Sequence, residues 1–450
     1  MKTPAPKSAV SPARAAAFDI LMRVEREDAF ASELLHAGRF EKLSPADHGL
    51  LTELVMGVLR WRSRLDAVIA GASSQPVAKL DAEVLSALRL GVYQLGWLER
   101  VPARAAIHES VELVKAARKR SAAGFVNAVL RKLAADSMWR QPKQTACTTL
   151  SSLAERFAHP SWLVERWIAA FGFEAAEKIC EYNQRPPVTA IRLRDPQAED
   201  ELRAVGVELA PGNLLSNARR VVSGDITRTN AFRERRVVIQ DEASQLVAAL
   251  LGRGERLLDC CAAPGSKTSA FADRNPDATV VAADVHPHRA RLLRRLVRGE
   301  HVHVVAADAR ELPLGLKFDR VLTDVPCSGT GTLARNPEIK WRLRSTDLAD
   351  LHARQVAIVS SALTHVAPGG RLIYSTCSLE PEENEQVVSE VMRERSDFRL
   401  LDCSLELQKL RDSGELAWAD IASLATGRLL RTIPGVHPCD GFFAVVIERA

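Results

Sequence analysis

Val-Leu-Thr-Asp-Val-Pro-Cys-Ser-Gly-Thr-Gly at residues 321–331 and Leu-Ile-Tyr-Ser-Thr-Cys-Ser at residues 372–378 each lead from a short apolar run to a cysteine. A run of this kind that ends in small and polar residues is typical of a buried strand followed by a turn. Cys327 and Cys377 are therefore expected at the carboxyl ends of two parallel strands, where open α/β sheets bind their ligands. A thiolate in such a place is a ready nucleophile.

Similar apolar runs alternate with helical stretches from residue 237 onward, which predicts βαβ units in a parallel, Rossmann-like sheet. We assign 237–450 to this α/β domain. The expected strands are 256–259, 279–284, 303–307, 318–324, 371–376 and 443–448.

The first part of the chain has a different texture. Residues 12–135 are rich in Ala, Leu, Val and Arg with apolar positions at helical spacing, which predicts an all-helical domain. Prolines at 12, 45 and 102 mark helix starts. The expected division is a flexible arm at 1–11, a helical domain at 12–140, a small α/β linker subdomain at 150–236 and the sheet domain at 237–450.

Composition limits the classes of protein to consider. No apolar run reaches the length of a membrane span and the N-terminus lacks a signal-peptide core, so we expect a cytoplasmic protein with no membrane partner. The net charge is +5, and residues 1–140 carry 21 Lys and Arg against 15 Asp and Glu. This excess favours an anionic partner for the helical half, although solvated helix faces would explain it equally well.

The eight cysteines show neither Cys-x-x-Cys pairs nor zinc-like spacing with histidine, so we expect no disulfide and no metal. Only the two strand-end cysteines are expected to act chemically. A role as small buried hydrophobic residues is expected for Cys147, Cys180, Cys260, Cys403 and Cys439.

A turn of small residues follows the first strand of the sheet domain and opens a helix. Its backbone N–H groups can approach a ligand closely. A dinucleotide fingerprint needs three glycines and a Walker A loop needs Gly where Ser266 stands, so neither fits. Lys267 supplies a cation that favours a nearby thiolate. The turn consists of Cys261, Ala262, Ala263, Pro264, Gly265, Ser266 and Lys267.

Three aspartates end successive predicted strands: Asp284, Asp308 and Asp324. An acid about 25 residues past the first turn is placed to accept hydrogen bonds from ribose hydroxyls. Any one of them alone is explained as well by a helix N-cap. Together they indicate a cofactor that contains a nucleoside.

These motifs resemble those of the RNA 5-methylcytosine methyltransferases. That family carries Cys-Ala-Ala-Pro-Gly-x-Lys, Asp-x-Pro-Cys-Ser and Thr-Cys-Ser, found here in order at 261–267, 324–328 and 376–378. The resemblance covers 153–450, and residues 12–135 resemble the NusB-like RNA-binding domain of the bacterial small-subunit rRNA methyltransferase B (Fmu/Sun) branch. It implies a class I methyltransferase fold behind a NusB-like domain and a small α+β subdomain.

The resemblance implies that S-adenosylmethionine lies on the turn 261–267, with Asp284 on its ribose, Asp308 near its adenine and Asp324 close by. The family usually has glycine at position 266. A serine is small enough for the turn unless its φ is positive.

For catalysis the resemblance implies that Cys377 adds to cytosine C6 and that Cys327 assists release as a general base. Asp324 would engage the base, and Lys267 would support the site. The segment 335–342 offers cations and an aromatic ring to an unstacked base and its phosphates. The expected RNA contacts are Arg335, Asn336, Lys340 and Trp341. The acidic segment 380–384 is interpreted as a helix start without a chemical role.

The expected activity is methylation of cytosine C5 in small-subunit rRNA by a monomeric enzyme. The catalytic motifs alone also permit a tRNA cytosine-C5 methyltransferase, although the final strand at 443–448 leaves no room for a C-terminal RNA-binding domain. A DNA cytosine methyltransferase would use Cys327 as its nucleophile. A non-catalytic RNA-binding or antitermination factor is the alternative from another class.

Overall fold

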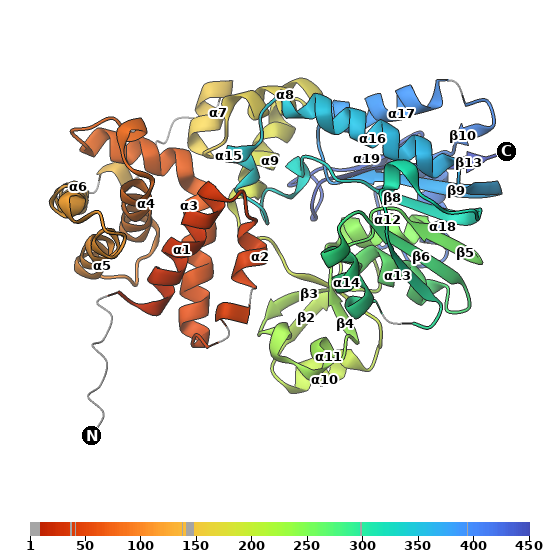
Figure 1. Cartoon of the computed structure of the whole chain (residues 1–450), viewed down its shortest axis with the longest axis horizontal. Helices are drawn as coiled ribbons and strands as arrows, with labels where there is room; N and C mark the ends of the chain where they lie inside the picture. Colours follow the sequence, from red (N-terminus) through yellow and green to blue (C-terminus); the bar gives the residue numbers. More distant parts are fainter. Residues whose placement is uncertain are drawn as a thin grey trace. The chain divides into compact units, whose positions relative to one another are not determined.

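The computed structural model describes residues 10–36, 38–40, 42–136, 138–140, 148–297, 299–393 and 395–450. The chain divides into two compact units (Figure 1). The helical unit comprises the chain up to Arg185 together with Leu333–Arg342. The sheet unit comprises Pro186–Thr332 and Leu343–Ala450. None of the helices within the described ranges is long and apolar enough to cross a membrane.

The helical unit confirms the predicted all-helical region. Pro12 and Pro45 each open a helix, where the missing N–H of proline costs nothing, and Pro102 caps another. Buried aliphatic side chains at helical spacing form its core. Its α-helices are α1 (Pro12–Arg26), α2 (Ala31–Leu35), α3 (Pro45–Ala72), α4 (Ala82–Trp97), α5 (Ala103–Ala116), α6 (Ala123–Ala135), α7 (Leu150–Arg156), α8 (Ser161–Phe171), α9 (Phe173–Gln184) and α15 (Ile339–Arg342).

The predicted domain limits differ from this division in two places. Residues 150–236 do not stay together, because helices α7 to α9 bury apolar residues such as Leu153 and Trp167 within the helical unit. The predicted arm is shorter than expected, since Val10 is buried and the Ser11 hydroxyl donates to Glu109 at 2.7 Å. Residues 1–9 of that arm, residue 137 of the predicted helical domain and residues 141–147, which follow that domain, lie outside the described residues.

The sheet unit begins with a small antiparallel sheet. Its described strands follow the order β2-β3-β1-β4. Ile191, Leu202 and Val237 are buried between this sheet and its helices. The elements are β1 (Ala190–Leu193), β2 (Glu208–Pro211), β3 (Ala218–Ser223), β4 (Val237–Ile239), α10 (Ala198–Ala204) and α11 (Asn230–Arg233).

The larger sheet has the order β11-β12-β13-β9-β8-β5-β6-β7, with β10 beside β13. Strands β5 to β9 are parallel and β13 runs antiparallel to β9. Their bounds are β5 (Arg256–Asp259), β6 (Thr279–Asp284), β7 (Val302–Ala306), β8 (Phe318–Asp324), β9 (Val366–Thr376), β10 (Phe398–Leu400), β11 (Ala425–Thr426), β12 (Leu429–Thr432) and β13 (Phe442–Arg449). The predicted Rossmann-like sheet is confirmed, with β7 one residue earlier and β9 five residues longer than expected.

Helices cover both faces of this sheet (Figure 1). They are α12 (Glu242–Leu250), α13 (Ser266–Arg274), α14 (Pro287–Leu296), α16 (Asp347–Leu363), α17 (Glu385–Met392), α18 (Cys403–Asp412) and α19 (Ile421–Leu424). The strand order reverses between β5 and β8, because β6 and β7 follow on one side and β8 and β9 on the other. Ligands of open α/β sheets bind at the carboxyl ends of strands at such a switch point.

Candidate active site

The two strand-end cysteines lie together at this carboxyl edge. Cys327 follows β8 and Cys377 follows β9, and their Sγ atoms are 3.3 Å apart. This is a sulfur hydrogen bond between free thiols, since a disulfide would measure about 2.05 Å. The hydrogen bond with Cys377, burial and the charge of Glu383 raise the pKa of Cys327 well above the usual thiol value. Cys327 therefore keeps its proton and can donate it to the Cys377 sulfur.

A buried carboxylate ties the two cysteine turns together from the core side. Glu383 Oε1 accepts from the Ser328 backbone N–H at 2.8 Å and from the Gln355 amide at 2.9 Å. Its Oε2 accepts from the hydroxyls of Ser378, at 2.5 Å, and of Ser328. Each serine directly follows one of the two cysteines, so this carboxylate fixes the spacing of the thiols.

The sequence analysis missed Glu383 because it interpreted the acidic segment 380–384 only as a helix start. The segment does form a short helical turn, Pro381–Glu383, before α17. The available signal was a serine after each cysteine, since two hydroxyls at neighbouring strand ends need a shared acceptor when they are buried.

Asp324 and Lys267 form an ion pair beside the thiols. The Lys267 Nζ lies 2.7 Å from Asp324 Oδ2, and Ser375 donates to Oδ1 at 2.8 Å. Burial alone would lower the pKa of Lys267, but the Asp324 carboxylate outweighs it and the pKa is raised. The charged ammonium also interacts electrostatically with Cys377.

The turn 261–267 has a backbone shape that requires glycine at one position. Gly265 has φ +109°, and a Cβ there would lie 2.6 Å from side-chain carbons of Leu293 and Val297. Ser266 is the first residue of α13 and has no positive φ. A serine therefore fits where the related motif has glycine.

Asp259 is a second residue that the sequence analysis missed. It ends β5 immediately before the turn, and burial raises its pKa to about 7. Thr268 donates to its Oδ2 at 2.7 Å, whereas its buried Oδ1 has no partner among the described atoms. Because an unpaired buried acceptor is costly, this oxygen suits a ligand that brings a donor. The sequence signal for Asp259 is its place at the end of a predicted strand, the same feature that indicates Asp284, Asp308 and Asp324 at the three later strands.

The other two aspartates lie at the same edge of the sheet. Asp284 is buried at the end of β6 and accepts from the His286 N–H at 2.9 Å. Asp308 follows β7, and hydrogen bonds from Arg310 lower the pKa of its carboxyl. Their parts in binding ribose and adenine stay predictions.

The structure contradicts the predicted RNA contact at Lys340. Its ammonium is buried and donates to the backbone carbonyls of Arg60 at 2.8 Å and Ala158 at 3.0 Å. Trp341 is half-buried, and its indole N–H donates to the Leu59 carbonyl at 2.6 Å. A cation held by carbonyls inside a helical core cannot reach a phosphate, so Lys340 is a structural residue.

The two remaining predicted contacts also lie in this inserted segment, Leu333–Arg342. Asn336 Oδ1 accepts from the Ser32 hydroxyl at 3.1 Å. Arg335 is half-buried. RNA binding by Arg335, Asn336 and Trp341 stays a prediction.

The remaining cysteines follow their expected role where they are described. Cys180, Cys260, Cys403 and Cys439 are buried, and Cys147 lies outside the described residues. Within the described part of the chain, no cluster of three or more His, Cys, Asp or Glu residues is arranged to hold a metal ion.

Known families and proteins match this chain over most of its length. Residues 248–448 match the family 16S rRNA methyltransferase RsmB/F, residues 11–135 match the NusB family, and residues 159–212 match the ferredoxin-like domain of RsmF/B-like methyltransferases. A probable ribosomal RNA small subunit methyltransferase B from Bacillus subtilis is 35% identical over 449 residues, 96% of this chain and 98% of the relative. The chain belongs to the RsmB/F family.

Other members and a solved structure support the assignment to the RsmB/F family. Ribosomal RNA small subunit methyltransferase B from Klebsiella pneumoniae is 34% identical over 372 residues, which cover 80% of this chain and 85% of that protein. A crystal structure of a methyltransferase homologue from Pyrococcus horikoshii is 26% identical and superposes with a TM-score of 0.55, covering 68% of this chain and all of the other.

Proposed function

We propose that this RsmB/F protein methylates cytosine C5 in small-subunit rRNA with S-adenosylmethionine, through a covalent bond between Cys377 and cytosine C6. The observation that carries the proposal is the pair of thiols 3.3 Å apart beside the Asp324–Lys267 ion pair. One thiol can attack while the other handles a proton. The names of the relatives support small-subunit rRNA as the substrate.

The residues at the end of β5 fit the cofactor. Gly265 keeps the turn open to a close approach, and the unpaired Oδ1 of Asp259 would accept from the ammonium group of the methionine part. Asp284 would take the ribose hydroxyls. When bound, S-adenosylmethionine supplies an electrophilic methyl group.

Cys377 begins the reaction. Its thiolate, which would lie near the Lys267 cation and within hydrogen-bonding distance of the Cys327 S–H, adds to C6 and forms an S–C6 bond. The electron pair of the C5–C6 double bond moves toward C5, which becomes nucleophilic. Asp324 would hold the N3/N4 edge of the base during this addition.

Release reverses the addition. C5 would take the methyl group of bound S-adenosylmethionine as the sulfonium S–CH3 bond breaks, and S-adenosylhomocysteine would be left. C5 would then lose its proton to a base as the S–C6 bond breaks and the thiolate of Cys377 returns. Cys327 would first lose its own proton to solvent and would then accept the C5 proton, which returns it to the thiol form. A thiol with a raised pKa is a strong base once it is ionised.

A trapping experiment tests the proposal. Cys327→Ala should accumulate a covalent protein–RNA complex on denaturing gels when it is incubated with unmethylated small-subunit rRNA and S-adenosylmethionine, since addition proceeds and release stalls. Cys327→Ala/Cys377→Ala is the matched control and should give no complex.

Wild-type product analysis completes the test. Digested rRNA should contain 5-methylcytosine and no other new methylated base. Product at another ring atom, or a covalent complex that forms without Cys377, would contradict the mechanism.

A further inference from the structure

A concentrated run of positive charge lies outside the thiol site, on helix α14 of the sheet unit. Residues 285–299 contain five arginines, two histidines and no acidic residue, a charge equal to the +5 of the whole chain. Arg289, Arg291, Arg294 and Arg295 fall on α14. All four are exposed, and none of them forms an ion pair with a described residue.

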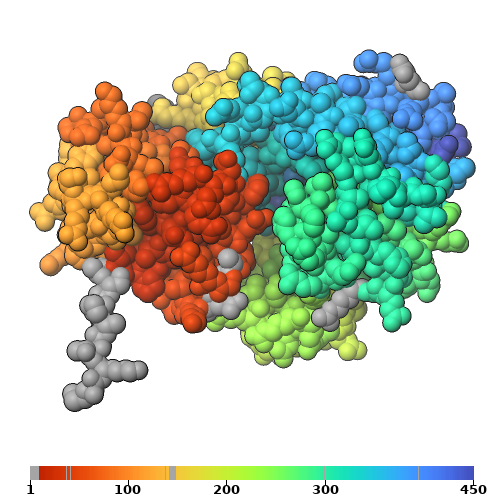
Figure 2. Space-filling view, viewed as in Figure 1, coloured from red at the N-terminus to blue at the C-terminus, as the bar shows by residue number. Residues whose placement is uncertain are grey.

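The helix divides sharply into two faces. Ala290 and Leu293 are buried, while the other eight residues of α14 are exposed. Leu293 and Val297 pack against Gly265 of the cofactor turn. The outer face of the helix is thus exposed (Figure 2), although Arg294 also donates to the Val304 carbonyl at 3.3 Å. The inner face packs against the turn.

The arginines on this face repel one another, which destabilises the helix in the isolated protein. Arg291 lies three residues before Arg294 and four before Arg295, so like charges are neighbours on the helix surface. Such pairs destabilise a helix, and within the described residues no carboxylate offsets them. An external polyanion would remove the repulsion.

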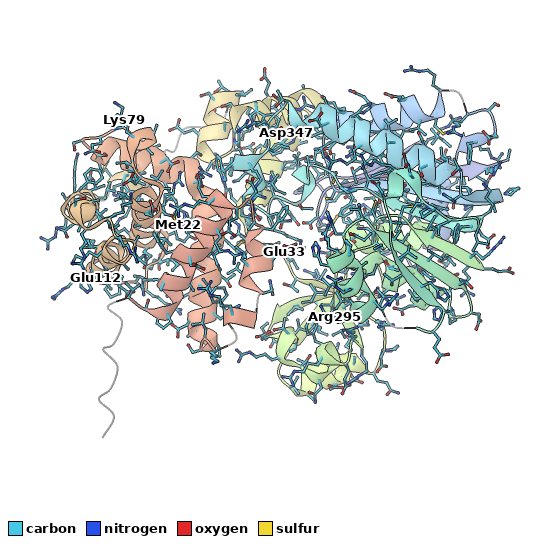
Figure 3. All side chains as sticks on the ribbon, in the orientation of Figure 1. Met22, Glu33, Lys79, Glu112, Arg295 and Asp347 are labelled. Atoms are coloured by element: carbon cyan, nitrogen blue, oxygen red, sulfur yellow. The ribbon has the colours of Figure 1, made fainter. Side chains whose placement is uncertain are left out.

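Neighbouring groups extend the same surface. The guanidinium of Arg235, which precedes β4, donates to the carbonyl of Arg295, the residue labelled on α14 in Figure 3. The rings of His286 and His288 lie 5.5 Å apart at the start of the helix. Imidazole rings and guanidinium planes are both suited to stack on unpaired bases.

The position of the helix relates it to the thiols. α14 begins after Asp284 at the carboxyl end of β6, and β6 is separated from β8 by β5 alone. With strands about 4.8 Å apart, β6 lies roughly 10 Å from β8 and 14 Å from β9. Phosphates close to a base held at the thiols can therefore reach this helix.

We propose that the outer face of α14, with Arg289, Arg291, Arg294 and Arg295, binds the phosphodiester backbone of the substrate RNA next to the target cytosine. The inference rests on the proposed function for the identity of the RNA. The face contributes affinity rather than sequence selection, since phosphate contacts carry no base information. Its loss therefore raises Kd and KM for RNA and leaves kcat at saturating RNA unchanged.

The test uses the full chain and an unmodified transcript of small-subunit rRNA. Arg289→Gln/Arg291→Gln/Arg295→Gln should raise Kd in filter binding at least about tenfold. It should also reduce the slope of log Kd against log salt by about 2, because each lost single-strand phosphate contact removes roughly 0.7. The Kd for S-adenosylmethionine should stay unchanged, because the inner face of α14 is untouched.

The matched control removes three exposed arginines that have carboxylate partners in the same unit. Arg203, Arg228 and Arg399 pair with Glu199, Asp225 and Glu448. The variant Arg203→Gln/Arg228→Gln/Arg399→Gln loses the same charge and should bind RNA within about twofold of wild type. An equal loss of RNA affinity in both variants would show an effect of net charge alone and overturn the proposal.

Two further outcomes separate this inference from the proposed function. If wild type makes 5-methylcytosine and the α14 variant keeps its KM and salt slope, the inference fails while the function stands. If wild type makes no 5-methylcytosine but RNA binding still depends on the α14 arginines, the function fails while the surface stands. Arginine-dependent binding of phosphatidylserine vesicles without arginine-dependent RNA binding would overturn the inference in favour of a membrane surface.

Discussion

Two buried lysines, one in each unit, show how differently the same side chain can be used. Lys267 at the thiol site faces a carboxylate at 2.7 Å and an aromatic ring centre at 4.9 Å. Lys340 in the inserted segment donates to two backbone carbonyls and lies 5.2 Å from the centre of the Trp341 ring, with no carboxylate among its described contacts. Asp324 outweighs burial and raises the pKa of Lys267, whereas burial lowers the pKa of Lys340 well below its usual value. A buried lysine acts on chemistry where a carboxylate keeps it charged.

Two buried glutamates repeat the contrast. Glu383 accepts hydrogen bonds from both cysteine turns, and its charge reaches Cys327. Glu338 accepts from the backbone N–H of Ala31 at 2.8 Å, and its Oε2 has no partner among the described atoms. The first organises a site and the second closes the end of a helix. Paired substitutions in the two regions can test this division.

The largest difference is expected between Cys377→Ala and Trp341→Phe. Removing the nucleophile should lower kcat by about 10⁴-fold or more with the fold intact. Removing the indole N–H that donates to the Leu59 carbonyl should leave kcat unchanged and cost about 1 kcal/mol of stability. Methyl incorporation from labelled cofactor and thermal melts measure both. Residual turnover near wild type in Cys377→Ala would place the nucleophile elsewhere.

The second-largest difference is expected between substitutions of the two lysines. Lys267→Met removes the partner of Asp324 and should reduce kcat by about 10²-fold, because the carboxylate and thiol lose their fixed positions. Lys340→Met leaves two carbonyls unpaired and should destabilise the helical unit by about 2–4 kcal/mol. Single-turnover rates and calorimetry separate the two losses.

The contrast between the lysines has its own control. Lys267→Arg restores a cation next to Asp324 and should recover part of the lost rate without changing Tm. If Lys340→Met lowers kcat at a temperature where the variant is fully folded, the inserted segment acts on the reaction. The contrast between a chemical role for Lys267 and a structural role for Lys340 is then wrong.

A smaller effect is expected for Glu383→Gln. The amide keeps much of the hydrogen bonding but removes the charge that raises the pKa of Cys327. We expect kcat to fall about tenfold. The pH at which Cys327 is half-alkylated should also fall when Cys377→Ala/Glu383→Gln is compared with Cys377→Ala. An unchanged alkylation profile would show that the Glu383 carboxylate has only a structural role.

The sequence predicted the sheet unit well because its signals are local. Buried parallel strands are short apolar runs, and those at 256–259, 279–284 and 318–324 were located to the residue. The thiols, Lys267 and Asp324 followed from motifs at strand ends, and the topology of the sheet brings them together. The compact units divide the chain differently from the predicted domains at α7 to α9, because the burial of these helices depends on contacts between distant residues.

The missed and misplaced residues share a cause. Asp259 and Glu383 gain their character from what surrounds them in space, an unpaired oxygen in one case and four hydrogen bonds in the other. Lys340 has the residue type of an RNA contact, but only its burial shows that it is structural. Spacing along the chain does not carry such information.

The smallest effect is expected for Glu338→Gln, the counterpart of Glu383→Gln in the helical unit. Burial raises the pKa of Glu338, so the folded state holds a proton that the unfolded state releases above about pH 4.3. This carboxyl therefore makes the free energy of unfolding fall as pH rises through that range. A neutral amide removes the dependence and keeps the bond from Ala31. Glu338→Gln should match wild type in kcat and in Tm at pH 4. Its Tm should exceed that of wild type by a margin that grows toward neutral pH, where the difference in the free energy of unfolding is on the order of 1 kcal/mol. A Tm below that of wild type at pH 7 would show that the ionised carboxylate stabilises this helix end.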